Sequence, residues 1–86
     1  MIQELQKKEH KYQMLSVKSN ISISYAELAK KFEYTPKVLK KGENFEMKSW
    51  EIEKVSNLIN DIINNSNYTL VSVSEDSEYL RYHFVS

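Results

Sequence analysis

The residues that could do chemistry are few and widely separated in this chain. The only histidines are His10 and His83, and no carboxylate stands at metal-ligand spacing from either of them. Gly42 is the only glycine, so no glycine-rich loop can bring backbone N–H groups close to a phosphate. Because the chain has no cysteine, it also lacks thiolate nucleophiles and cysteine-bound zinc sites. We therefore expect no catalytic residue, no cofactor and no metal, and predict that the protein is not an enzyme.

His83 is the histidine with the clearest structural setting. The strand predicted at 79–85 should bury its alternating apolar residues, which are Leu80, Tyr82 and Phe84. His83 then points outward, which favours a surface histidine over a ligand or a general base. With eleven serines in the chain, a serine close to His83 would not by itself indicate a catalytic triad.

Two features are typical of protein binding instead. The first is an acidic turn with an adjacent aromatic residue, made of Glu75, Asp76, Glu78 and Tyr79. Carboxylates held on a firm scaffold can occupy sites built for nucleic-acid phosphates. The second is Trp50, because buried tryptophan and tyrosine side chains dominate interface energetics. Each feature also has a purely structural explanation. Trp50 can pack on the segment 19–47, and an acidic turn can discourage edge pairing of strands.

A competing hypothesis is DNA binding through a basic patch. The patch consists of Lys30, Lys31, Lys37, Lys40 and Lys41. These lysines could neutralise phosphates, although the patch has no arginine for bidentate contacts to guanine. Residues 1–41 carry nine Lys and four Glu, a net charge of +5, whereas residues 42–86 carry two Lys and one Arg against six Glu and two Asp, a net charge of −5. Such polarity fits a nucleic-acid face, an acidic docking face or head-to-tail self-association.

Capping and hydrophobic periodicity predict two helices that would position these residues. Ser24 and Glu27 form a capping box, which predicts a helix that begins at Ser24 and ends before Pro36. Its buried stripe should be Tyr25, Leu28, Ala29 and Phe32. The second helix is predicted to begin with Ser49 as its N-cap and to end at Asn65. Its apolar face should consist of Ile52, Val55, Leu58, Ile59, Ile62 and Ile63.

The other segments are predicted to form strands or short helical pieces. The acidic turn should join strands 68–74 and 79–85 into a hairpin. Residues 11–17 can form a third strand or continue a short helix over residues 2–10, because a short apolar run does not decide the period. A further helical turn is expected at 36–41, since proline is well accommodated in a first turn.

Two stretches resemble known families. ISYAELAKKFEYTPKVLKK is similar to the paired helices of helix-turn-helix proteins, with apolar or small residues at the expected positions Leu28, Ala29, Phe32 and Leu39. Glu33 stands where that family usually has a glycine with left-handed backbone angles. With the second helix and the hairpin, the resemblance covers residues 22–41 and 49–85 and implies a winged-helix DNA-binding transcriptional regulator.

The second resemblance runs through KYQMLSVK and NNSNYTLVSV, over residues 11–18 and 49–85. It is similar to a small family of uncharacterised bacterial and phage domains built as strand, helix and hairpin. In that family a motif reading like EGWELVSV precedes the second strand of the fold, and Asn67 and Tyr68 stand where it has its Gly-Trp pair. This resemblance implies a fold and no activity.

Together these features predict one α+β domain over residues 1–86. A small antiparallel sheet, made of the C-terminal hairpin and a third strand from 11–17, should pack on the amphipathic helix, with one or two shorter helices beside it. A hydrophobic content of 41% and a charged content of 28% fit a soluble globular chain. No apolar run is long enough to span a bilayer, and the N-terminus lacks the apolar core of a signal peptide, so we expect a cytoplasmic protein.

The leading functional hypothesis is a non-enzymatic protein-binding module. Eleven Lys against one Arg, with many Asn, Ile and Tyr, indicate AT-rich coding, which is typical of a low-GC bacterium or one of its phages. Together with the lack of catalytic groups and the acidic C-terminal half, this favours a phage or mobile-element protein. Such a protein would occlude a host protein, for example a defence component with a nucleic-acid site, in the host cytoplasm. A second copy of the chain is a further candidate partner. The alternative is the winged-helix regulator, and only there is DNA a partner.

Overall fold

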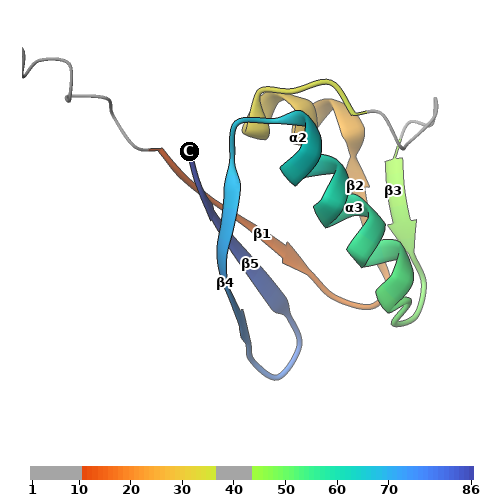
Figure 1. Ribbon diagram of the computed structural model, residues 1–86. Coiled ribbons are helices and arrows are strands. Elements are labelled where there is room, and N and C mark those ends of the chain that lie inside the picture. Colours follow the sequence, from red (N-terminus) through yellow and green to blue (C-terminus); the bar gives the residue numbers. More distant parts are fainter. Residues whose placement is uncertain (1–10, 37–43) are drawn as a thin grey trace, which may run out of the picture.

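The computed structural model describes residues 11–36 and 44–86 of the chain (Figure 1). Its elements, in chain order, are β1 (Tyr12–Val17), β2 (Ile21–Ser24), α2 (Tyr25–Phe32), β3 (Asn44–Met47), α3 (Ile52–Asn65), β4 (Thr69–Glu75) and β5 (Leu80–Val85). The predicted α+β class is thereby confirmed. The short helix predicted within residues 2–10 lies outside the described residues, as does nearly all of the turn predicted at 36–41.

The larger sheet contains the predicted hairpin and the third strand. Its strand order is β1-β5-β4 and both pairings are antiparallel. Residues 11–17 therefore form a strand and do not continue a helix. In β1, Leu15 and Val17 are buried, and Leu15 lies opposite Tyr82 of β5. Phe84 is also buried, while Leu80 and Tyr82 pack against the core, so the inward alternation predicted for β5 is confirmed.

A second, two-stranded sheet was not predicted. Strand β2 pairs antiparallel with β3, with Ile21 opposite Met47 and Ser24 opposite Asn44. The turn from β1 into β2 passes through Asn20, whose φ of 65° is left-handed and is better tolerated by asparagine than by most residues. With four residues in each strand, the alternation of buried and exposed side chains is too short to be recognised from the sequence.

Helix α2 begins where its capping residue predicts. The Oγ atom of Ser24 accepts hydrogen bonds from the backbone N–H groups of Ala26 at 3.1 Å and Glu27 at 3.4 Å. The helix ends at Phe32, earlier than the proline-based prediction, because Glu33 takes the left-handed angles φ 56° and ψ 54°. This early end lets the following residues turn toward α3.

Helix α3 begins later than predicted. Glu51 is its N-cap, without a side-chain hydrogen bond, so the prediction of Ser49 as the N-cap was wrong. Strand β3 extends to Met47, and the chain uses residues 48–51 to turn from the strand into the helix. As a consequence, Ile52 stands in the first turn and is 56% exposed, although it was expected on the buried face.

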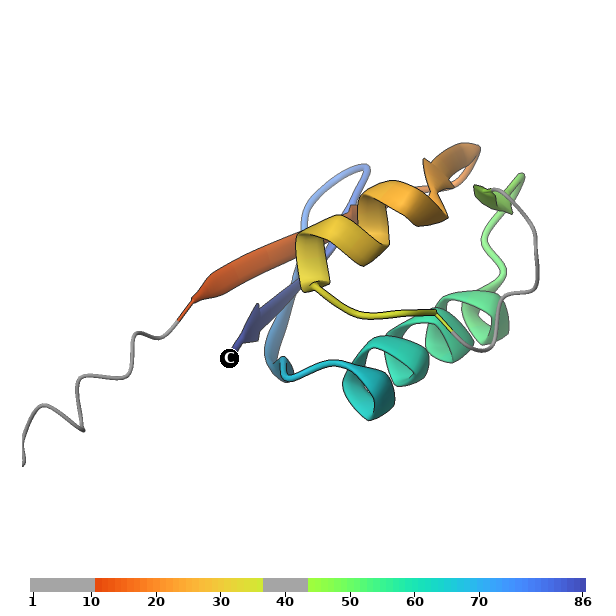
Figure 2. The same cartoon turned by 90° about the horizontal axis from the view of Figure 1, so that it is seen from above.

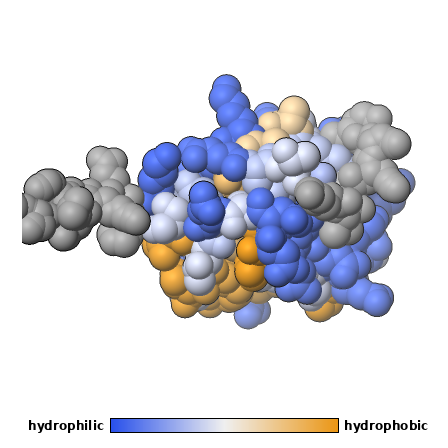
Figure 3. Space-filling model, turned by 45° about the horizontal axis from the view of Figure 1, so that its top comes forward, coloured by the Kyte–Doolittle hydropathy of each residue, from blue (hydrophilic) through white to orange (hydrophobic). Residues whose placement is uncertain are grey.

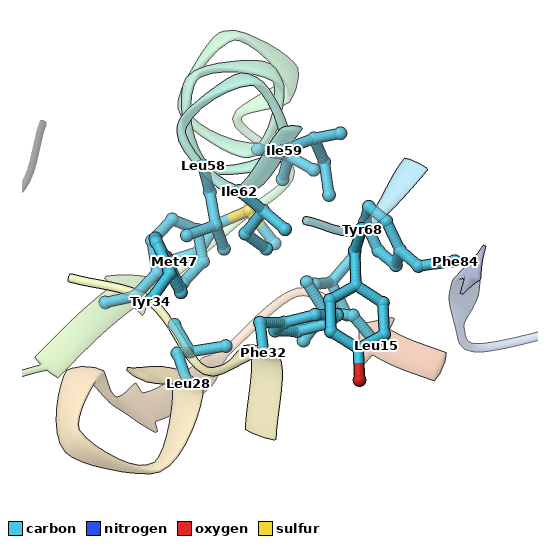
Figure 4. Close-up of a cluster of buried hydrophobic side chains, with 13 residues drawn as sticks. Leu15, Leu28, Phe32, Tyr34, Met47, Leu58, Ile59, Ile62, Tyr68 and Phe84 are labelled. Atoms are coloured by element: carbon cyan, nitrogen blue, oxygen red, sulfur yellow. The ribbon is translucent and has the colours of Figure 1, made fainter. Parts of the chain in front are cut away.

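The core lies between the two helices and both sheets (Figures 1 and 2). Phe32 of α2 is its centre, with the ring of Tyr68 at 5.3 Å and the ring of Phe84 at 4.9 Å between centroids (Figure 4). Both ring pairs are edge-to-face, the arrangement that aromatic quadrupoles favour. Of the predicted stripe on α2, Leu28 and Phe32 are fully buried and the other two residues are partly buried.

One carboxylate is buried within this core. Asp61 of α3 is 1% exposed, and its Oδ1 atom accepts a hydrogen bond from Asn65 Nδ2 at 2.8 Å. The hydroxyl of Tyr34 donates to Oδ2 over 3.4 Å. Burial, and then the nearby charge of Asp61, raise the pKa of Tyr34 far above its usual value, so the phenol stays protonated. This contact joins the segment after α2 to α3.

Neither of the helices in residues 11–36 and 44–86 combines the length and the apolar content that crossing a lipid bilayer would require.

Candidate functional site

The fold brings the residues predicted for partner binding together around one hollow, which we call the turn hollow. It has a volume of about 320 Å³ and lies between the end of the β4–β5 hairpin and the start of α3. It is lined by Trp50, Ile52, Glu75, Asp76, Ser77, Glu78, Tyr79 and Leu80. All five predicted partner-binding residues are in this set, although they come from two segments far apart in the sequence.

Trp50 is the largest apolar side chain that lines the turn hollow. It is 45% exposed, so the segment 19–47 does not bury it. Trp50 also lines a neighbouring hollow of about 390 Å³, together with Lys18, Ser19, Asn20, Ser77 and Glu78. An indole in this position offers a large contact area on both sides and loses little side-chain entropy when it is bound.

Asp76 organises the acidic turn through its carboxylate. Its Oδ1 atom accepts the backbone N–H groups of Glu78 at 3.1 Å and Tyr79 at 3.0 Å, and its Oδ2 atom is paired with the guanidinium of Arg81. The pairing with Arg81 and these backbone hydrogen bonds hold the pKa of Asp76 at about 2. Its negative charge is therefore largely balanced within the turn.

Tyr79 is likewise held by its neighbours. The Nζ atom of Lys18 lies 5.5 Å from the centroid of its ring, and the Cζ atom of Arg81 lies 5.0 Å from the same centroid. The residue is partly buried. All three acidic residues of the turn are exposed, and among the described residues Asp76 has an ion-pair partner whereas Glu75 and Glu78 have none.

Acid should loosen this turn at a defined pH. Because the folded-state pKa of Asp76, about 2, lies below its usual value of 3.8, the carboxylate stabilises the turn above pH 3.8 and loses that effect as the pH falls through 2. In an NMR titration from pH 5 downward, the amide resonances of Glu78 and Tyr79 should shift with a midpoint near pH 2. The same resonances in the variant Asp76→Asn should show no such step. A midpoint near 3.8 in the native protein would show that the turn does not stabilise the carboxylate.

His83 lies on the sheet face that α2 and α3 leave uncovered, as predicted, but it has partners there. Its Nδ1 atom is 2.7 Å from the hydroxyl of Tyr12, and its Nε2 atom is 2.9 Å from Oγ of Ser74. The spacing of serine and histidine matches a nucleophile and a base, yet the third group is a phenol and not a carboxylate. None of these three residues lines the turn hollow or the hollow that Trp50 shares with Lys18.

In the described ranges 11–36 and 44–86, no group of three histidine or acidic side chains is placed to hold a metal ion.

The residues predicted for DNA binding are only partly placed by the structure. Lys30 and Lys31 stand in the last turn of α2, where a positive charge is favoured by the helix dipole. Lys30 is exposed and Lys31 is partly buried. Lys37, Lys40 and Lys41 lie outside the described residues.

Sequence reasoning missed the contribution of Ile52 and Lys18 to the site. Ile52 lines the turn hollow and also a shallower hollow of about 550 Å³ beside the first turn of α3, with Glu51, Glu53, Lys54 and Asn57. Ile52 is exposed because α3 begins late. The sequence did not indicate this late start, because Ser49 is a better capping residue than Glu51 and suggested an earlier one. No local signal identifies Lys18, which reaches the site only through the turn between β1 and β2.

The two family resemblances stay predictions. Glu33 does adopt the left-handed angles at which helix-turn-helix proteins usually place a glycine. The second helix of the predicted pair falls mostly on residues that the structure does not describe. Comparison of the chain with protein-family models, with curated proteins and with solved structures found no match.

Proposed function

We propose that this chain is a non-enzymatic protein-binding module that attaches to its partner through the turn hollow. The observation that supports it is the position of a half-exposed Trp50 next to the exposed carboxylates of Glu75 and Glu78, around one hollow of about 320 Å³. An exposed tryptophan inside a polar rim is the usual composition of an interface centre. Asp76 keeps the rim in place, so little ordering is required on binding.

The chemistry of the hollow defines the surface that it would recognise. A matching partner surface would place apolar side chains against Trp50 and Ile52, and lysine or arginine side chains opposite Glu75 and Glu78. A protein surface that binds nucleic acid offers both groups. The module would then occlude that surface, as a phage or mobile-element protein acting on a host defence protein in the bacterial cytoplasm.

Affinity capture from host lysate, followed by binding measurements on the captured protein, tests this function. Trp50→Ala should weaken binding by roughly 30-fold, the effect of a hot-spot residue worth about 2 kcal/mol. The double reversal Glu75→Lys with Glu78→Lys should weaken it at least comparably and invert its salt dependence, because salt then screens a repulsion. Glu53→Lys is the matched control, because Glu53 is exposed on α3 outside the turn hollow. Binding that tolerates the Trp50 and double-reversal variants as well as Glu53→Lys would refute the site.

Occlusion has its own readout. The captured protein should lose its affinity for nucleic acid when the module is added, and should keep it when Trp50→Ala is added at the same concentration. If both additions leave nucleic-acid binding unchanged, the module binds elsewhere on its partner and the occlusion mechanism is wrong.

The competing proposal is a winged-helix regulator, favoured by the left-handed Glu33 and by Lys30 and Lys31 in the last turn of α2. A regulator should retard duplex DNA in a gel at low salt, and Lys30→Glu with Lys31→Glu should abolish the shift. A protein-binding module should leave the duplex unshifted.

A further inference from the structure

Strand β4 lies at an edge of the three-stranded sheet, and its outer edge has no partner strand among the described residues. From Thr69 to Ser74 it has no charged residue and no proline. Edge strands that stay unpaired usually carry lysine or proline to prevent pairing with another strand. The protection present in β4 is a single register irregularity between Leu70 and Ser72.

The side chains of β4 are also more apolar than solvent exposure favours. Val71 is 55% exposed and Val73 is 48% exposed. In the space-filling view most of the visible surface is hydrophilic, and hydrophobic side chains gather at its lower left, on the side of the molecule where β4 lies (Figure 3). Between α3 and the hairpin a hollow of about 230 Å³ is lined by Ser56, Ile59, Asn60, Leu70 and Tyr82. Helix α3 therefore leaves part of the core next to β4 uncovered.

We propose that β4 is the interface of a homodimer, in which it pairs antiparallel with β4 of a second copy. Two copies of β4 are complementary to each other, because a twofold axis at Ser72 places Val71 opposite Val73 of the partner subunit. Both exposed valines then become cross-strand neighbours, which is the contact that stabilises paired strands. The two three-stranded sheets become one continuous sheet of six strands.

The distribution of charge along β4 also favours a second copy of the chain as its partner. In the same register Glu75 stands opposite Thr69 of the partner subunit, so the two copies of Glu75 lie at opposite ends of the paired strands. No like charges face each other, and the uncharged stretch between Thr69 and Ser74 lets the backbones approach. One strand pair is expected to bury less than the roughly 1,200 Å² of a stable interface, so the dimer should be weak and reversible.

A cysteine cross-link locates the axis directly. The chain has no cysteine, so Ser72→Cys introduces a single thiol at the proposed axis. In the full-length protein, mild oxidation should convert most of this variant to a disulfide-linked dimer. Ser22→Cys is the matched control, because Ser22 is an exposed serine of a strand in the other sheet, and it should remain mostly monomeric. Equal cross-linking of both variants, or of neither, overturns the proposal.

Sedimentation equilibrium tests the same interface without a cross-link. The native chain should show a reversible dimer, and Val73→Lys should raise its dissociation constant at least about tenfold by placing a charge on the edge strand. Asn57→Lys introduces the same charge on the exposed side of α3 and should leave the dissociation constant unchanged. Far-ultraviolet circular dichroism shows whether each variant is folded. A native chain that stays monomeric up to 500 μM, or a dimer that persists in folded Val73→Lys, refutes the β4 interface.

Discussion

Phe32→Ala should lower the free energy of unfolding by about 3–5 kcal/mol, the range for loss of a buried aromatic ring. Phe32 is fully buried, and its ring contacts those of Tyr68 and Phe84. It therefore joins α2 to the residue that precedes β4 and to strand β5. A domain of this size has only about 5–10 kcal/mol of stability, so the variant should lose about a third of it or more. Urea denaturation followed by circular dichroism measures the change.

Trp50→Ala is the control for this loss. It also removes a large aromatic ring, but from a side chain that is 45% exposed and outside the core cluster. We expect a cost below about 1 kcal/mol, in the range of ordinary surface substitutions. A cost for Phe32→Ala as small as that for Trp50→Ala would show that Phe32 is not central to the core. A small cost for Trp50→Ala also means that its loss of partner binding reflects the interface and not unfolding.

Asp61→Ala should be the most damaging change of a polar residue, at about 3 kcal/mol. It removes the acceptor of the Tyr34 hydroxyl inside the protein, and it removes one acceptor of the Asn65 side-chain amide, which keeps its hydrogen bond to the backbone carbonyl of residue 61 at 3.0 Å. Tyr34→Phe should cost about 1 kcal/mol, because it removes one hydrogen bond and leaves the carboxylate with its other partners. Thermal unfolding of the variants measures both effects.

Tyr68→Phe is a matched control for Tyr34→Phe. The hydroxyl of Tyr68 is buried and has no hydrogen-bond partner in the described structure, so its removal should leave stability unchanged or raise it by up to about 1 kcal/mol. If Tyr68→Phe were as destabilising as Tyr34→Phe, the difference between a paired and an unpaired buried hydroxyl would not hold for this protein.

The sequence predicted the elements whose signals are local. The capping box at Ser24 and the apolar periodicity of α3 each depend on a few neighbouring residues, and both helices formed. Strand β5 followed its clean alternation in the same way. The start of α3 was misjudged because Ser49 has good capping chemistry, but the turn out of β3 requires that residue outside the helix.

Features that depend on contacts distant in the chain could not be predicted. Strands β2 and β3 stabilise each other, and neither alone has enough residues to show a period. The residues of the turn hollow were chosen separately, Trp50 as an anchor and the acidic turn for its charge. Their proximity depends on how the hairpin packs next to α3. The internal roles of Asp76 and Tyr79 depend on Arg81 and Lys18, whose positions the sequence pattern does not define.

The strand order has a consequence for the synthesis of the protein. Strand β5 is the central strand of its sheet and the last element of the chain, and Tyr12 pairs with Val85 across almost the whole described sequence. While the ribosome is still translating the hairpin, neither β1 nor β4 has its partner strand, and closing so long a loop makes folding slow. The nascent chain should therefore complete its sheet only after β5 has emerged from the ribosome, and until then Leu15, Val17 and the valines of β4 are available to chaperones.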